Sequence, residues 1–385
     1  MQKLIFTIIV AAIFYLGGAI TVQYNLFPYP EIVMLRNGKS FFSPKDFKKI
    51  NITNDMVYGL DGYKTDKRFI RLPLNQKNVL RKVVWDLSKN PSGGRIKFKT
   101  NSNAIYIEAI SKGIKTPANM TGIMKNGIDI YVNDIYYGST YPNKDYSIKK
   151  LFEFQKDNDF NEITLYLPLY EDIEIKNILI PNKSKIIKSS DLLKIKPIIY
   201  YGTSITQGGC ASNPGLSYQA ILERRLKIDF KNLGFSGNGL GDIEIAKYIS
   251  ESETSLIVLD YWANPSPKIF KQTLPLFVKE IRKKHKNTPI IVVSPYYSVN
   301  RIKFQNEKRK IALDFVKQIK QHGDKNIYYL DGRKMLSKET SFGLVDGRHL
   351  NSLGFWFVAN KMEKVIKKLL YSSKPNKYEE TNNLP

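Results

Sequence analysis

From residue 197 onward, short apolar runs alternate with segments of helical periodicity, and this alternation constrains the fold of the chain more than any other feature. The apolar runs begin near five positions, Ile198, Phe230, Leu256, Ile290 and Ile327. Amphipathic helical spacing fills residues 217–226, 269–284, 307–321 and 353–370. Strands that are separated by helices of this length join in parallel, so the sequence predicts an α/β fold with a doubly wound parallel sheet over residues 192–371.

The preceding part of the chain, over residues 55–185, has a different pattern. Short runs with period-two alternation cover residues 95–99, 104–110, 128–132 and 163–167. Turn residues such as Gly93-Gly94 and Asn126-Gly127 separate them. Short strands with frequent turns are typical of an antiparallel β-sandwich, so we expect an accessory β-sandwich domain here. A segment rich in Lys, Ser and Asn near residues 182–191 is then the linker between the two domains.

The N-terminus carries an uncharged 19-residue run, from Leu4 to Val22, which follows Lys3. This length lies between that of a signal peptide and that of a membrane span, which needs about 20 apolar residues. We therefore predict a signal peptide or membrane anchor over residues 1–24, and a Pro- and Lys-rich spacer over residues 25–54. Either alternative predicts an extracytoplasmic protein: secreted, periplasmic or anchored to the membrane. The polar tail over residues 372–385 is predicted to be disordered.

The formal net charge of +25 allows several kinds of anionic partner. A basic surface can bind nucleic acid, anionic lipid or acidic glycan. No nucleic-acid-binding motif accompanies the charge, and an export signal argues against nucleic acid as a partner. Contact with an anionic cell-surface polymer or a membrane stays open. In the simpler interpretation, the lysines are distributed over solvent-exposed faces and have no specific partner.

Cysteine and histidine are too few for the common metal sites. The single cysteine, Cys210, excludes an intrachain disulfide and a Cys-based zinc site. The three histidines have no metal-ligand spacing. We therefore expect neither a catalytic metal nor a cofactor.

A serine, a histidine and an aspartate occupy positions that suit an activated nucleophile. Ser204 directly follows the first apolar run of the parallel sheet, where such sheets present catalytic groups. Asp346 and His349 lie three residues apart on a later loop, although a D-G-x-H sequence is also compatible with an ordinary turn. A serine hydroxyl needs a base, and His349 is the best candidate because His285 and His322 lie at predicted helix ends.

Two further strand ends offer hydrogen-bond donors for an oxyanion. The second apolar run is followed by a Gly-rich segment over residues 232–239, where backbone N–H groups can approach a ligand closely. The third run is followed by Asn264, whose amide could also donate. A Gly-rich segment or a single asparagine is common in ordinary turns. The position of both after successive strands is what indicates an oxyanion site.

These segments resemble the SGNH (GDSL-like) hydrolases, in which Ser, Gly, Asn and His mark four sequence blocks. Residues 202–215 are similar to the first block of one branch, and residues 232–239 to its second block. Asn264 stands at the asparagine of the third block, and Asp346 with His349 matches the last. That branch carries an N-terminal β-sandwich with a G-x-D-L-Y element, which residues 127–131 (Gly-Ile-Asp-Ile-Tyr) resemble. Residues 167–170 resemble a later element of the same domain, so the resemblance covers about residues 60–370.

The resemblance implies a flavodoxin-like catalytic domain after a jelly-roll-like sandwich, and ester hydrolysis through an acyl-enzyme. In that mechanism Ser204 attacks, His349 acts as base and then acid, and Asp346 orients His349. The N–H groups of Ser204 and Gly237 and the amide of Asn264 hold the oxyanion. The implied substrate is an acylated small molecule or glycan. The first candidate among these is a short-chain ester, O-acetyl above all, on a carbohydrate or cell-surface glycan.

The chain departs from the branch in its last two blocks. The sequence around Asn264 differs, Leu350 replaces the usual proline, and Ser352 replaces a common aspartate. These departures bear on the choice of substrate more than on catalysis. Two alternatives stay open: an acyltransferase that uses the same Ser-His-Asp residues, and a glycan-binding protein with a vestigial catalytic site.

Overall fold

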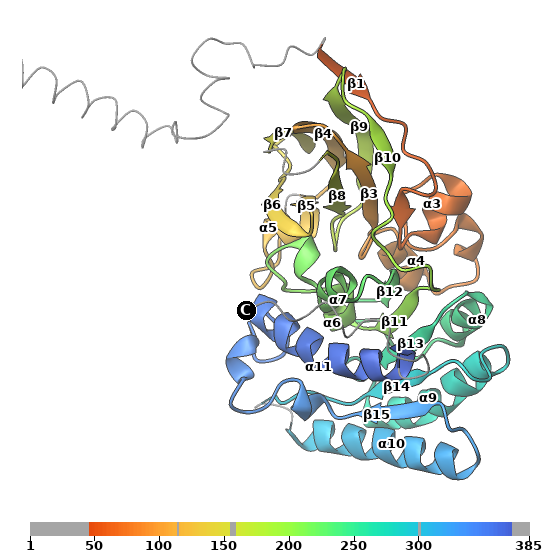
Figure 1. The fold of residues 1–385 in the computed structure, drawn as a ribbon. Helices are drawn as coiled ribbons and strands as arrows, with labels where there is room; N and C mark the ends of the chain where they lie inside the picture. The colour runs from red at the N-terminus through yellow and green to blue at the C-terminus, as the bar shows by residue number, and fades with distance from the viewer. Residues whose placement is uncertain (1–45, 114, 155–158, 299–301, 372–385) are drawn as a thin grey trace, which may run out of the picture.

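The computed structural model describes residues 46–113, 115–154, 159–298 and 302–371. An antiparallel β domain comes first along the chain, and an α/β domain follows it (Figure 1). The predicted signal or anchor segment, Leu4 to Val22, and the predicted tail over residues 372–385 lie outside the described residues. Within the described ranges, no helix is both long enough and apolar enough to cross a membrane.

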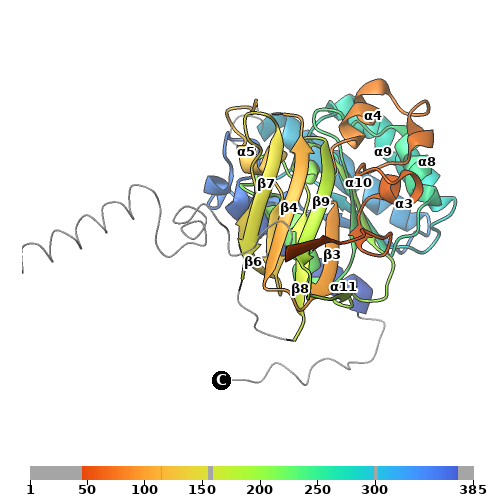
Figure 2. The same cartoon turned by 90° about the horizontal axis from the view of Figure 1, so that it is seen from above.

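The first domain is a β-sandwich, as the period-two pattern predicts. One sheet has the order β1-β9-β4-β7, and the other has the order β10-β3-β8-β5-β6 with β2 paired to β3. The strands are β1 (Phe47–Lys49), β2 (Val57–Tyr58), β3 (Arg95–Thr100), β4 (Ala104–Ser111), β5 (Asp129–Val132), β6 (Ile135–Ser139), β7 (Ser147–Glu153), β8 (Asn161–Tyr166), β9 (Ile173–Pro181) and β10 (Ile186–Lys188). Figure 2 shows β7, β4 and β9 side by side, with β3 and β8 behind them. Apolar side chains from both sheets, among them Phe98, Ile107 and Leu165, form the core between them.

The edges of this domain differ from the sequence-based boundaries. β1 lies within the predicted spacer and β10 within the predicted linker, because each pairs with a neighbouring strand and extends a sheet. The domain also contains three short helices, α3 (Asp61–Asp66), α4 (Lys82–Ser88) and α5 (Gly122–Asn126). Strand patterning alone gave no sign of them, because each spans only one or two turns.

The second domain has a five-stranded parallel sheet with the order β12-β11-β13-β14-β15. The strands are β11 (Ile198–Gly202), β12 (Phe230–Gly234), β13 (Leu256–Asp260), β14 (Ile290–Val293) and β15 (Ile327–Leu330). Numbered along the chain, this order is 2-1-3-4-5, the flavodoxin-like arrangement. The five predicted strand starts therefore match the structure.

Helices cover both faces of this sheet (Figure 1). They are α6 (Ser204–Gln207), α7 (Tyr218–Leu226), α8 (Ile243–Glu251), α9 (Pro267–Arg282), α10 (Ile302–Gln321) and α11 (Ser352–Tyr371). α7 packs against α11, whereas α9 packs against both α8 and α10. Because both faces are covered, strands β11, β13 and β14 are buried along their whole length, as expected for a parallel sheet.

The core of the α/β domain extends into the first domain. Leu72, Val84 and Trp85, from the segment around α4, belong to the same buried cluster as the strands of the parallel sheet. A buried ion pair also joins the domains, with Lys97 Nζ 2.8 Å from Glu223 Oε1 and both side chains fully buried. The two domains are therefore packed together as one body.

Candidate active site

Ser204 lies where the order of the parallel sheet reverses. β11 has β12 on one side and β13 on the other, and loops that leave such a point in opposite directions open a crevice. Thr203 follows the last residue of β11 and caps α6, because its side chain accepts a hydrogen bond from Ile205 N. Ser204 is the first residue of α6 and is only 4% exposed. Its hydroxyl is thus fixed at the bottom of the crevice.

The structure brings Ser204, His349 and Asp346 into one hydrogen-bonded chain. Ser204 Oγ lies 3.0 Å from His349 Nε2, and His349 Nδ1 lies 2.7 Å from Asp346 Oδ2. The carboxylate can only accept, so the ring proton resides on Nδ1 and leaves Nε2 to accept from the serine hydroxyl. His285 and His322 contact backbone carbonyls of Ile249 and Gln318, in agreement with their predicted places at helix ends.

A tight loop holds Asp346 and His349 together. Val345 N donates to His349 O at 2.9 Å, and Asp346 Oδ1 accepts from the backbone N–H groups of Arg348 and His349 at 3.0 and 2.7 Å. Partial burial on its own would raise the pKa of Asp346. The hydrogen bonds from the His349 backbone and ring and from the Asn119 amide outweigh this effect and hold the pKa well below its usual value. Asp346 therefore stays ionised opposite the imidazole.

The predicted oxyanion donors follow the ends of three neighbouring strands, β12, β11 and β13. Asn264 Oδ1 accepts from Gly239 N at 3.1 Å, so the amide NH₂ is the end of Asn264 that turns away from this loop. Gly237 has φ +70°, a conformation that favours glycine. Among the described residues, neither Ser204 N–H nor Gly237 N–H has a hydrogen-bond acceptor, so both can serve a ligand.

Two side chains of the first domain reach this site, and sequence reasoning missed both. Asn119 Nδ2 donates to Asp346 Oδ2 at 2.9 Å, the same oxygen that contacts the His349 ring. Tyr170 OH donates to the carbonyl oxygen of Ser204 at 3.1 Å. The sequence distinguishes the segment of Tyr170 only by its resemblance to a family element, and nothing around Asn119 distinguishes it from an ordinary loop residue.

A buried arginine of the first domain supports the loop after β12. Arg71 is 2% exposed, and its guanidinium donates to the carbonyl oxygens of Asn90, Leu87, Asn232 and Gly234. It also stacks 4.7 Å from the ring centre of Phe235. Burial lowers the pKa of Arg71 to about 9, so it remains charged at neutral pH. Because Gly234 is three residues before Gly237, Arg71 fixes the start of the oxyanion loop.

The Gly127–Tyr131 element (the G-x-D-L-Y-like segment) is part of the contact between the domains. Asp129 is fully buried, and its Oδ2 accepts from Gly215 N at 2.8 Å. Burial raises the pKa of Asp129 to about 6 against the hydrogen bonds that it accepts. The element therefore holds the segment that follows the nucleophile helix, and its role in this structure is contact between the domains.

A second buried carboxylate, Asp260, lies below the site at the end of β13. Its oxygens accept from Trp262 Nε1 at 2.9 Å and from Thr206, Tyr218 and Tyr296 hydroxyls at 3.2 to 3.3 Å. Burial raises its pKa to about 7 in spite of these donors. Asp260 ties the helix of the nucleophile to the two aromatic residues that wall the neighbouring pocket.

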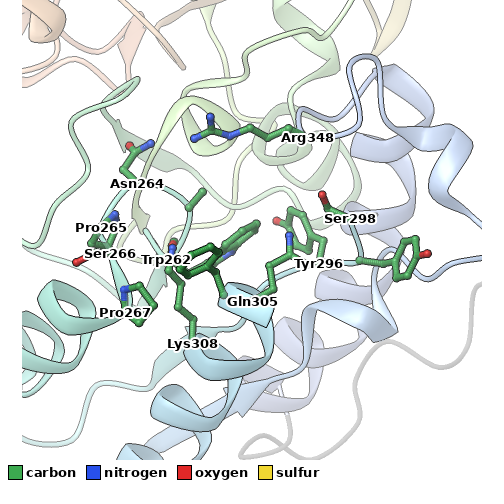
Figure 3. A pocket seen from close by; sticks show the side chains of 13 residues that line it. Trp262, Asn264, Pro265, Ser266, Pro267, Tyr296, Ser298, Gln305, Lys308 and Arg348 are labelled. Carbon is green, nitrogen blue, oxygen red and sulfur yellow. The ribbon is translucent and has the colours of Figure 1, made fainter. Parts of the chain in front are cut away.

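A pocket of about 470 Å³ opens beside Asn264 and the loop of His349 (Figure 3). Four aromatic and two amide residues belong to its wall, together with the cationic residues Lys308 and Arg348. The lining residues are Trp262, Ala263, Asn264, Pro265, Ser266, Pro267, Tyr296, Tyr297, Ser298, Phe304, Gln305, Lys308 and Arg348. Its place next to the candidate oxyanion site makes it the space in which part of a substrate can lie.

Two other kinds of reactive group find no support among the described residues. Cys210 is buried, and burial together with the charge of Asp346 raises the pKa of its thiol to about 12. No group of three or more His, Cys, Asp or Glu side chains in the described part of the chain has the arrangement of a metal site.

Each of the two domains matches the model of a known protein family. A model of the GDSL-like lipase/acylhydrolase family matches residues 195–367, and a model of the GxDLY domain, the N-terminus of SGNH-hydrolase-type esterases, matches residues 46–186. Among curated proteins, none matches the chain.

Solved structures share the two-domain architecture. A Bacteroides ovatus protein described as a GDSL-like lipase is 27% identical, with a TM-score of 0.77 over 84% of this chain and 98% of its own. The salicylyl-acyltransferase of a tetracycline biosynthetic pathway is 19% identical, with a TM-score of 0.73 over 85% and 98%. A family two carbohydrate esterase from Clostridium thermocellum, solved with cellohexaose, is 14% identical, with a TM-score of 0.57 over 72% and 92%. The last two are similar in fold alone.

The two family models lie next to each other along the chain and together take in most of the β-sandwich, the whole parallel sheet and every residue described above for the crevice and the pocket. The chain belongs to the GDSL-like lipase/acylhydrolase (SGNH hydrolase) family, in the branch with an N-terminal GxDLY domain, and is an ester-cleaving enzyme of that family.

Proposed function

We propose that the protein is a serine esterase that removes short acyl groups, O-acetyl above all, from a carbohydrate or cell-surface glycan. The observation that carries this proposal is the continuous hydrogen-bonded chain from Ser204 Oγ through His349 to Asp346, at 3.0 and 2.7 Å. A serine in contact with an imidazole that a carboxylate orients is the arrangement that activates a hydroxyl for acyl transfer.

In the first step Ser204 Oγ attacks the acyl carbon while its proton passes to His349 Nε2. The new Oγ–C bond produces a tetrahedral intermediate whose negative oxygen faces the N–H groups of Ser204 and Gly237 and the Asn264 amide. Aimed donors in a partly closed site stabilise such an oxyanion strongly. The bond to the sugar oxygen then breaks, and the imidazolium returns the proton to that oxygen as the alcohol leaves.

In the second step water attacks the acyl-enzyme. His349 takes a proton from the water, the second tetrahedral intermediate collapses, and Ser204 recovers its proton as the carboxylic acid leaves. Ionised Asp346 faces the imidazolium in both steps and stabilises its charge. An alcohol in place of water would give acyl transfer with the same residues.

We also propose that the enzyme works outside the cytoplasm. The uncharged run from Leu4 to Val22 supports this location, because its length suits engagement with a membrane. A glycan substrate at the cell surface agrees with that location. Fractionation of cells that express the full chain tests it, and recovery from the cytosol alone would overturn it.

The test of the activity is a screen of the purified protein against aryl acetates, longer aryl esters and acetylated glycans, with Ser204→Ala as the control. We expect acetate release, a preference for short acyl groups, and labelling of Ser204 by a covalent serine probe. Product analysis with added alcohols separates hydrolysis from acyl transfer. Absence of both turnover and labelling would leave the protein as a binding module with a vestigial site.

A further inference from the structure

The α/β domain has a further hollow, on the surface of α11 (blue in Figure 1), which the proposed reaction does not use. This α11 cleft has a volume of about 270 Å³ and lies between α11 and the segment over residues 333–340. Four of its nine lining residues are cationic, and none is an aspartate or glutamate. The four are Arg333, Lys334, Lys361 and Lys364. A hollow that is lined by one sign of charge attracts a ligand of the opposite sign.

Three of the four cations have no carboxylate partner among the described residues: Lys334, Lys361 and Lys364. Arg333 differs, because its guanidinium is bound to Asp331. An anion that enters the cleft therefore meets three ammonium groups whose charge is not already compensated. Each of them can donate a charge-assisted hydrogen bond to a carboxylate.

The neighbouring glutamates are directed to other partners. Glu363, the acidic residue of α11, contacts Arg225 and Lys367 at 3.2 and 2.8 Å. Glu339 accepts from Ser337 Oγ at 2.6 Å at the edge of the cleft and does not line it. The balance of charge inside the cleft is therefore positive.

Exposed aromatic side chains connect the α11 cleft with the catalytic loop. Phe357 lines the cleft, and its ring centre lies 5.9 Å from that of Phe342 and 5.7 Å from that of Trp356. Phe342 and Trp356 are 61% and 46% exposed. The carbonyl oxygen of Phe342 accepts from Asn351 Nδ2 at 2.8 Å, at the base of the loop that carries His349. Exposed apolar groups that form a contiguous patch mark a binding surface.

These features together favour one kind of ligand. The cleft is concave, so a narrow chain fits it better than a flat bilayer does. Its wall contains an amide and two hydroxyl groups, from Asn360, Ser337 and Thr340, which can hydrogen-bond to sugar hydroxyls. The aromatic rings offer apolar faces on which the C–H groups of a sugar can pack. A small inorganic anion would use the lysines alone and leave the aromatic patch without a role.

We propose that the α11 cleft binds an acidic polysaccharide, with carboxylates of the chain on Lys334, Lys361 and Lys364 while an esterified unit of the same chain lies at Ser204. This proposal rests on the proposed esterase function and adds a second contact with the substrate polymer. A chain that is held in the cleft raises the local concentration of its ester groups at the crevice. The site therefore selects acidic polymers over neutral ones without touching the reacting atoms.

The first test measures binding by titration calorimetry, with an oligogalacturonate and with the neutral oligomer that carboxyl reduction makes from it. We expect the acidic oligomer alone to bind at low ionic strength. Lys361→Gln/Lys364→Gln should weaken this binding by about 10-fold or more, the order of two charge-assisted contacts at a protein surface. Lys268→Gln/Lys271→Gln is the matched control and should keep the affinity, because it removes two exposed lysines with the same spacing from α9.

Tryptophan fluorescence locates the bound oligomer. Trp356 is 46% exposed, whereas Trp85 and Trp262 are 4% and 5% exposed, so quenching by acrylamide reports mainly on Trp356. The acidic oligomer should protect Trp356 from acrylamide in the natural protein and in the α9 control. It should give no such protection in Lys361→Gln/Lys364→Gln at the same concentration.

Kinetics connect the site with the reaction. On a polygalacturonate that is acetylated at its ring hydroxyls, Lys361→Gln/Lys364→Gln should raise KM by about 10-fold, in line with the loss of binding, while turnover of an aryl acetate stays unchanged. Absence of binding, equal binding of the acidic and neutral oligomers, or binding that survives the substitution would overturn the proposal. It would also be overturned if the substitution reduced only attachment to phosphatidylglycerol vesicles, since the cleft would then be a membrane contact. Failure to cleave any ester while the acidic oligomer still binds in the cleft would instead contradict the proposed function.

Discussion

The two domains contribute to the active-site crevice in different ways. The α/β domain supplies Ser204, Gly237, Asn264 and the Asp346–His349 loop, all of which follow strands or lie on short loops at one end of the parallel sheet. The β-sandwich supplies side chains that touch these groups from behind, at Asp346, at the Ser204 carbonyl and at the start of the oxyanion loop. One domain therefore carries the reacting groups, and the other holds them in position.

This difference gives the substitutions different expected signatures. Loss of a reacting group should abolish turnover and leave the fold intact, because such groups make few packing contacts. Loss of a support should change the free energy of unfolding together with turnover, because supports are buried hydrogen-bond donors. The four predictions below test this division, from the largest expected effect to the smallest.

His349→Ala should reduce kcat/KM for an aryl acetate by about 10³-fold or more, while the protein still unfolds in one cooperative transition. The expected size follows from the behaviour of serine and histidine as one catalytic unit. Steady-state kinetics and thermal unfolding measure the two quantities. His285→Ala and His322→Ala are matched controls on the same domain. A comparable loss of activity in either would show that the assignment of His349 as the base is wrong.

Asn264→Ala should lower kcat by about 10² to 10³-fold, the usual effect of removing one oxyanion donor, while KM changes much less. The amide oxygen of Asn264 is held by Gly239 N, so the substitution also removes one contact between two loops. Asn287→Ala, at an exposed asparagine of the same domain, is the control. An effect on KM alone would make Asn264 a substrate-binding residue.

Arg71→Met should lower the free energy of unfolding by about 3 kcal/mol, because several buried carbonyl oxygens lose their donor at once. Turnover should also fall, since Arg71 holds the strand end that leads to Gly237. Denaturant unfolding and kinetics on the same sample measure both effects. The exposed neighbour Arg68→Met serves as the control, and similar small changes in both variants would remove Arg71 from the set of supports.

Asn119→Ala should lower kcat/KM by about 10-fold, the order of one hydrogen bond to a charged group. Its bond helps to hold the pKa of Asp346 low, so the stability that it provides is present above the unfolded pKa of about 4 and is lost only as the pH falls through the lowered pKa of the folded protein. Denaturant unfolding at pH 7 should therefore show a loss of stability for Asn119→Ala, and this loss should largely vanish when Asp346→Ala has already removed the acceptor of the hydrogen bond.

Asn143→Ala is the matched control for this substitution, because Asn143 lies in the same domain and its amide bonds locally, to the Ser147 hydroxyl. A loss of stability of equal size with and without the Asp346 carboxylate would mean that Asn119 supports its own loop and not the charge of Asp346.

The reach of sequence reasoning differs between the two domains. The starts of all five parallel strands were predicted, because fully buried strands between amphipathic helices give long, regular signals. In the sandwich, β1 and β10 were assigned to a spacer and a linker, because strands of three residues leave no readable period. Pairing with a neighbouring strand, which the sequence does not display, makes them part of the sheets.

The site shows the same limit. Ser204, Asp346 and His349 could be selected because the chemistry requires those residue types and strand ends place them. Asn119 and Arg71 could not be selected, since their roles depend on how one domain docks on the other. An asparagine in a loop and an arginine in a helical connection have no local pattern that distinguishes a support from a solvated side chain.

The apolar cluster that includes Leu72, Val84 and Trp85 together with the parallel sheet has a consequence for how the protein comes apart. The two domains are separate along the chain but not in their interior, so heating should produce one calorimetric transition and not two. Cleavage by a protease at exposed Lys194 would leave two fragments that remain associated. Replacing either domain with that of a distant relative would leave poorly packed side chains in the shared core. Substitutions in this core must therefore be compatible with both domains.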